Sequence, residues 1–143
     1  MQNYTFKLSL RIWHPNIDPD EISKNLSISP NRSWKEGSQR VTPKGTILDG
    51  KYAETYWNAD PFKHGEYSSS SIRAEDVIEN LVKKLDSQKK FLKILKDQGA
   101  KIIIQISSFG EGNYALDLPP KLLNEISELS AGFAHDVYSC EQK

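Results

Sequence analysis

The sequence predicts an α+β fold, a mainly antiparallel sheet with helices packed on one face, in a single domain spanning residues 1–143. Stretches with an apolar period of two, typical of half-buried strands, lie towards both ends of the chain, and a long helical stretch joins them. Residues 17–22 and 118–123 each follow a predicted strand and begin a helix with proline. Two such halves joined by helices indicate a sheet covered on one face. The shared plan leaves open a two-fold internal pseudo-repeat of strand–helix–strand units.

The first predicted strand runs from Thr5 to Trp13, where apolar and polar residues alternate. One face of this strand is apolar and comprises Phe6, Leu8, Leu10 and Ile12. A short helix follows, because Asp18 is a good N-cap and Pro19 suits the first helical position. We expect this helix to end near Leu26.

Proline and glycine punctuate residues 29–51, so we expect loops there with at most a short strand around Arg32 to Lys35. The aromatic-rich segment from Tyr52 to Asn58 predicts another strand. Residues 59–71 show no apolar period and are expected to form a long surface loop. A loop of this length is either functional or disordered.

The middle of the chain predicts two consecutive amphipathic helices. Apolar residues recur at helical spacing between residues 77 and 95, with a break at residues 86–87 and a C-cap at Gly99. Residues 101–109 alternate again and predict a buried strand.

The last third of the chain predicts a hairpin, a helix and a final strand. Residues 110–113 form the expected turn, and residues 114–118 are expected to pair back as the second strand of the hairpin. Pro119-Pro120 opens a helix that Gly132 is expected to end, and residues 133–138 supply the final strand.

The composition excludes several functional classes. Lysine plus arginine equals aspartate plus glutamate at 19 each, so no net field draws the protein to nucleic acid or anionic lipid, although a local basic patch stays open. No apolar run approaches a membrane span, and the N-terminus lacks a signal-peptide pattern. The single Cys140 can form neither an internal disulfide nor a multi-cysteine metal site. We therefore expect a cytoplasmic protein without a cofactor or metal.

Tryptophans and arginines supply the candidate binding residues. Trp13 and Arg11 share the polar face of the first strand, so they lie on the open side of the sheet if the helices cover the apolar face. A glycine-containing basic segment surrounds Trp34 and could hold an anion. Strand parity does not decide whether Trp57 is buried. The candidate set for a ligand or partner is Arg11, Trp13, Arg32, Trp34, Arg40 and Trp57.

Each candidate has a structural alternative. The structural explanation, which the residue pattern favours, is a loop that covers Trp13 and an anchoring role for Trp34 within a solvated loop. A second functional hypothesis, a small metal-dependent or acid–base hydrolase, places Asp60, His64 and Glu66 of the long loop over a cleft. The alternative there is an ordinary polar loop. A third hypothesis, single-stranded nucleic-acid binding through sheet aromatics, is disfavoured by the neutral net charge.

The order of these features resembles a known family. The markers are Leu10-Arg11-Ile12, Asp18-Pro19, the segment from Pro30 to Trp34, Gly37, Tyr56-Trp57, the paired helices, and the stretch from Leu118 to Leu129. Together they resemble a bacterial family catalogued as domain of unknown function 4279. The resemblance implies a compact α+β domain in a bacterial cytoplasm, of a kind found among accessory or toxin-neutralising genes. It implies no activity, cofactor or catalytic residue.

These observations favour a non-catalytic binding or protein-interaction domain, with an immunity or inhibitor-type role as one form of it. We expect the partner to be a protein or a small polar ligand, held by the open sheet face and the tryptophan-bearing loops. Self-association as a homodimer stays open, because an exposed strand edge can pair across a two-fold axis.

Overall fold

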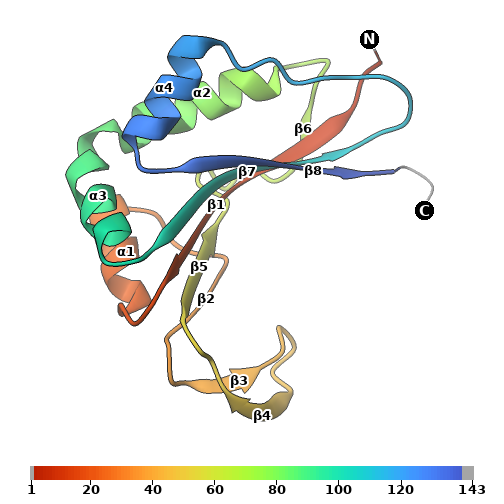
Figure 1. Ribbon diagram of the computed structural model, residues 1–143. Coiled ribbons are helices and arrows are strands. Elements are labelled where there is room, and N and C mark those ends of the chain that lie inside the picture. The colour runs from red at the N-terminus through yellow and green to blue at the C-terminus, as the bar shows by residue number, and fades with distance from the viewer. Residues whose placement is uncertain (1, 140–143) are drawn as a thin grey trace.

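The computed structural model describes residues 2–139, which form a six-stranded sheet, a separate two-stranded hairpin and a layer of helices (Figure 1). Cys140 lies outside the described residues. The strands of the sheet are β1 (Thr5–His14), β2 (Arg32–Trp34), β5 (Thr55–Ala59), β6 (Tyr67–Ser68), β7 (Lys101–Phe109) and β8 (Gly132–Tyr138). Their order is β2-β5-β1-β7-β8, with β6 beside the start of β1. Only β8 runs parallel to its neighbour, so the α+β class and the mainly antiparallel sheet are confirmed.

The helices all lie on one side of the sheet, as predicted (Figure 1). They are α1 (Pro19–Leu26), α2 (Ala74–Leu85), α3 (Lys89–Asp97) and α4 (Pro120–Glu128), with a 3-10 turn (Asp86–Gln88) between α2 and α3. Asp18 caps α1 by accepting a hydrogen bond from the Asp20 N–H at 2.9 Å. Within residues 2–139, no helix is long and apolar enough to cross a membrane.

The core lies between this helix layer and the facing side of the sheet. Alternate residues of β1 and β7 point into it, which is why the period of two is so clear in both strands. The fully buried sheet residues on this side include Phe6, Leu10, Ile12, Trp57, Ala59, Ile104 and Ile106.

The predicted hairpin strand at residues 114–118 is wrong. This segment forms no strand and instead leads to α4, while Leu116 and Leu118 pack against the core. The place beside β7 is taken by β8, which pairs with it in parallel over seven consecutive residues. Local spacing could not distinguish these two partners, since both segments carry alternating apolar residues.

The expectation of loops over residues 29–51 is also wrong in part. Besides β2, this region contains a hairpin of β3 (Gln39–Val41) and β4 (Ile47–Lys51), whose residues are all exposed. Without a buried face, these strands show no apolar period. Strand β5 begins at Thr55 and not at Tyr52, and the expected loop at 59–71 contains the short β6, which pairs with β1.

The internal pseudo-repeat that the sequence left open is not seen in residues 2–139. Strand β8 lies directly beside β7, whereas β2 is separated from β1 by β5. The second unit also ends differently from the prediction: α4 stops at Glu128, Ser130 adopts the left-handed conformation at φ 62°, and Gly132 already belongs to β8. The two proline-initiated helices therefore share a local start signal and no common topology.

Candidate recognition surface

The side of the sheet that faces away from the helices, here called the open face, is organised in cross-strand rows. Strand register places Trp13 between Lys101 on β7 and Tyr56 on β5, and Tyr56 in turn lies opposite Trp34 on β2. The neighbouring row, in the same strand order, consists of Ile103, Arg11, Asn58 and Arg32. An aromatic row therefore runs beside a row that carries two arginines. Side chains directly opposite each other on adjacent strands are close enough to interact.

The aromatic side chains form a continuous series of ring contacts, two of them tilted and the last stacked. This series, here called the aromatic ladder, consists of Trp13, Tyr56, Trp34 and Tyr52. Ring centroids are 5.3 Å apart between Trp13 and Tyr56, 4.7 Å between Tyr56 and Trp34, and 4.2 Å between Trp34 and Tyr52. Tyr56 is buried beneath its neighbours, while the other three rings are half-buried. The rings of Trp13, Trp34 and Tyr52 thus stay partly exposed to solvent, where a partner can contact them.

Cationic side chains lie over this ladder. The Arg11 guanidinium is 4.9 Å from the Trp13 ring, and its Nε donates a 2.9 Å hydrogen bond to the Tyr56 hydroxyl. The Arg32 guanidinium is 4.9 Å from the Trp34 ring, and Lys101 Nζ is 5.5 Å from the Trp13 ring. These are distances at which a cation is attracted to the face of an aromatic ring.

The positive charges of the open face are not neutralised by neighbouring carboxylates. Among residues 2–139, none of Arg11, Arg32 and Lys101 has a carboxylate oxygen within 4.0 Å, and the ion pairs found there involve other side chains. Arg11 instead donates to the neutral Gln105 Oε1 at 3.0 Å, and Gln105 donates to Asp136 Oδ2 at 3.1 Å. The guanidinium groups are thus held in place by rings and neutral acceptors, which leaves their charge uncompensated.

The hairpin β3–β4 extends this surface away from the sheet (Figure 1). Arg32 donates to the Val41 carbonyl at 3.0 Å, the Tyr52 hydroxyl donates to the same carbonyl at 2.8 Å, and both contacts tie the hairpin to the ladder. Arg40 lies on the hairpin and donates to the Asp49 carbonyl at 3.0 Å. Arg40 is therefore separate from the two rows of the sheet and belongs to the β3–β4 hairpin.

Trp57 belongs to the core. It shares the helix-facing side with Ile12, its partner in the register, and it is 0% exposed. Its indole N–H donates to Ser23 Oγ of α1 at 3.0 Å, so the one polar atom of the side chain is satisfied. The ambiguity that strand parity left is resolved by α1, which covers this side of β5.

Two residues of the hydrolase hypothesis, Asp60 and His64, have structural contacts of their own. Asp60 Oδ2 accepts the Gly65 N–H at 2.7 Å and closes the loop, while the His64 ring stacks on Tyr67 with centroids 3.7 Å apart. Burial, followed by the charge of Asp60, raises the pKa of Tyr67. In the described part of the chain, no three histidine, cysteine or acidic side chains are grouped as metal ligands.

His14, which lies outside that loop, has hydrogen-bond partners at both ring nitrogens. His14 Nδ1 accepts the N–H groups of Asn16 and Ile17 at 3.0 and 2.9 Å, and its Nε2 is 2.7 Å from Gln98 Oε1. A hollow of about 700 Å³ between α1 and α3 borders this histidine, whose two nitrogens are already bonded.

His135 Nε2 lies 2.8 Å from Ser108 Oγ, an arrangement that could suggest a nucleophile and its base. Ser108 is 0% exposed, and its hydroxyl is also 3.1 Å from the Tyr114 hydroxyl. The Ser108 hydroxyl is thus buried, and its contacts join β7, β8 and the loop that precedes α4. Burial lowers the pKa of His135, which favours its neutral form.

Of the predicted site residues, the structure brings Arg11, Trp13, Arg32 and Trp34 onto one surface and separates Arg40 and Trp57 from it. Sequence reasoning missed the residues that connect these four, namely Tyr52, Tyr56, Lys101 and Gln105. Lys101 and Gln105 have the same parity as Ile103 on their strand, and that parity was available from the sequence. The cross-strand register that puts them beside Trp13 and Arg11 was not.

Comparison with known sequences adds a family. The profile of a family described as "Domain of unknown function (DUF4279)" matches residues 3–140. No curated protein and no solved structure matches this chain. The match spans nearly the whole fold, including every strand of the open face.

Proposed function

This chain belongs to the DUF4279 family, whose description specifies no activity, and from that premise we propose that it is a non-catalytic binding domain that holds an acidic protein partner on its open face. One observation carries the proposal: half-buried tryptophans and uncompensated arginines alternate over a sheet face that no helix covers. Tryptophan, tyrosine and arginine are the residue types that contribute most to binding energy at protein interfaces.

The charge of the open face favours an acidic partner. Lys7, Arg11, Arg32 and Lys101 project on this side, and Lys7 Nζ lies 6.0 Å from the Phe109 ring. Two carboxylates lie near them: Asp136, which accepts from Gln105, and Glu54, which lines a hollow with Trp13 and Lys101. The four basic side chains outnumber these two. A patch of net positive charge attracts acidic surfaces over a distance and selects against basic ones.

A protein fits this surface better than a nucleic acid. The whole chain carries equal numbers of basic and acidic residues, so the general attraction on which nucleic-acid binding depends is missing. The hairpin also exposes apolar side chains next to the ladder, with Ile47 72% exposed. An apolar projection beside an aromatic and cationic face suits a folded partner with a mixed surface.

An inhibitor-type role is one form of this proposal. If the acidic surface lies at the active or binding site of the partner, a domain bound to that surface blocks access to the site and inhibits the partner. The chemistry of the open face is compatible with that role and requires no catalytic group.

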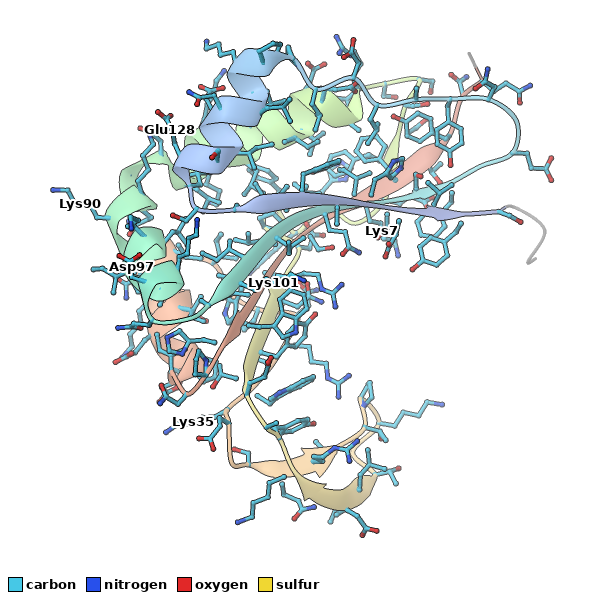
Figure 2. The ribbon with its side chains drawn as sticks, viewed as in Figure 1. Lys7, Lys35, Lys90, Asp97, Lys101 and Glu128 are labelled. Atoms are coloured by element: carbon cyan, nitrogen blue, oxygen red, sulfur yellow. The ribbon has the colours of Figure 1, made fainter. Side chains whose placement is uncertain are left out.

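The test uses the wild type and two charge-reversed variants as immobilised baits in lysate of the source cells, and compares which proteins each bait retains. The binding variant carries Lys7→Glu and Lys101→Glu on the open face. The matched control carries Lys90→Glu on α3 and Lys121→Glu on α4, and so changes the net charge by the same amount in the helix layer. Figure 2 shows Lys90 on the outer side of α3, away from Lys7 and Lys101. All four side chains are exposed, so both variants are expected to fold.

The proposal predicts a protein that the wild type and the control retain and that the open-face variant loses. Its retention should also weaken as the salt concentration rises, because surface charges are screened. Equal retention by the two variants, or retention that only the control loses, would contradict the proposal.

A further inference from the structure

A second interaction surface lies at the edge of the sheet, along β8. This strand pairs with β7 on one side over seven residues, and no strand among residues 2–139 pairs with its other side. In Figure 1 the outer side of β8 is likewise uncovered by any helix. An edge of this kind presents unpaired backbone N–H and C=O groups, which can pair with another strand.

Edge strands in monomeric proteins normally carry features that prevent such pairing, and in β8 the charged Asp136 is one of the few that are present. Its sequence, from Gly132 to Tyr138, contains no proline and no lysine, and its register with β7 shows no bulge. The strand also exposes apolar surface at its far end, where Val137 is 62% and Tyr138 43% exposed. It is therefore a long, regular and partly apolar edge.

We propose that a second copy of this chain pairs with β8 in the antiparallel direction, about a two-fold axis at His135, and joins the two sheets into one. In this register Phe133 of each copy lies opposite Val137 of the other, on the side of the helices. On the open side, Ala134 lies opposite Asp136, and Gly132 lies opposite Tyr138. Each exposed apolar residue of the strand thereby gains an apolar or small neighbour from the second copy.

Neighbouring registers are less favourable. An axis at Asp136 would place two aspartates directly opposite each other, and like charges in that position are destabilising. An axis at Ala134 would place Val137 and Tyr138 opposite residues 131 and 130, which lie outside β8. Only the axis at His135 pairs all seven residues, because it is the middle of the strand.

The surrounding structure permits this arrangement. Figure 1 shows α4 near the start of β8, with no helix over its far end. In an antiparallel pair the two copies of α4 therefore lie at opposite ends of the interface. An axis perpendicular to the sheet also puts both open faces on the same side. The inference does not depend on what the open face binds.

The first test is the concentration dependence of molar mass for the full chain, by sedimentation equilibrium. We expect the wild type to form a dimer and Val137→Lys to weaken its association by about tenfold or more, since a lysine on an edge opposes pairing. Ile47→Lys on the hairpin is the matched control, because it also places a lysine at an exposed β-branched strand residue. The control should dimerise like the wild type.

The second test reads out the register, in a background where Cys140→Ser removes the native thiol. With the axis at His135, residue 135 lies opposite itself, at a Cα separation that a disulfide can span. His135→Cys should form an intermolecular disulfide under mild oxidation, and Asp136→Cys should form much less. A chain that stays monomeric at all concentrations, a dimer unaffected by Val137→Lys, or preferential crosslinking at position 136 would each overturn the proposal.

Discussion

Two consecutive residues of β5, Tyr56 and Trp57, show how differently the two faces of this sheet are built. Trp57 points towards α1, is 0% exposed and is surrounded by the core. Tyr56 points the other way, into the aromatic ladder and under the Arg11 guanidinium. The covered face is mainly aliphatic and dry, whereas the open face is aromatic, cationic and half-exposed. The same strands thus carry one face that stabilises the fold and another whose chemistry, in our proposal, serves recognition.

The largest expected effect comes from the covered face. Trp57→Ala should lower the free energy of unfolding by about 3–5 kcal/mol, because it leaves a large cavity and removes the hydrogen bond to Ser23. Urea denaturation followed by circular dichroism measures this change. A loss below that of Trp34→Ala would show that the two faces do not differ as described.

The next prediction compares the loss of stability at two adjacent isoleucines of β7. Ile104 faces the helices and is 0% exposed, so Ile104→Ala should cost about 2–5 kcal/mol of stability. Ile103 lies half-buried on the open face, and Ile103→Ala should cost roughly 1 kcal/mol. Urea midpoints of the two variants, measured side by side, check the order. Equal losses would mean that the open face is covered in solution.

Trp34→Ala should have a smaller and more local effect. It removes the stack on Tyr52 and the 3.0 Å hydrogen bond from the indole to the Glu54 carbonyl, at a cost of about 1–2 kcal/mol. Because the ladder holds the hairpin, amide hydrogen exchange should accelerate at residues 38–52 while β1 and β7 stay protected. Uniform acceleration over the whole chain would contradict a local role.

The smallest effect is a pH dependence that arises at His135. Burial lowers its pKa below the ordinary 6.5, so the unfolded chain takes up the proton first as the pH falls. The free energy of unfolding should therefore decrease below about pH 6.5 and be unaffected by this group above it. Ser108 contacts His135, while Tyr114 and Glu111 line the same hollow as His135. The charge of Asp136 acts against the lowering of the His135 pKa. His135→Gln should flatten that decrease in urea midpoints measured across the range, and an unchanged slope would exclude the histidine as its source.

The covered face was the more predictable of the two. Strands and helices with one buried and one exposed side produce a clear apolar period, so β1, β7 and helices α1 to α3 were confirmed close to their predicted limits, whereas α4 ends earlier than expected. The hairpin β3–β4 has no buried side, and its sequence therefore carries no period. The pairing of β8 with β7 was missed because a local pattern indicates a strand without indicating its neighbour.

The candidate surface was predictable only in part. The parity of β1 placed Arg11 and Trp13 together on the side away from the apolar residues, and the structure has them there. Parity failed on β5, where aromatic residues occupy both sides and only the position of α1 decides which is buried. The continuity of the ladder depends on the register between β1, β5 and β2, which involves residues far apart in sequence.

The most direct measurement of whether the open face is the recognition surface is photo-crosslinking in the source cells. A photoreactive amino acid is placed at Lys101 in the aromatic row or, for comparison, at Lys90 on the outer side of α3 (Figure 2). Both positions are exposed, so each reports what lies against its own side of the molecule. Our account predicts a discrete protein adduct from position 101 and none from position 90. An adduct from position 90 alone, or none from position 101, would contradict it.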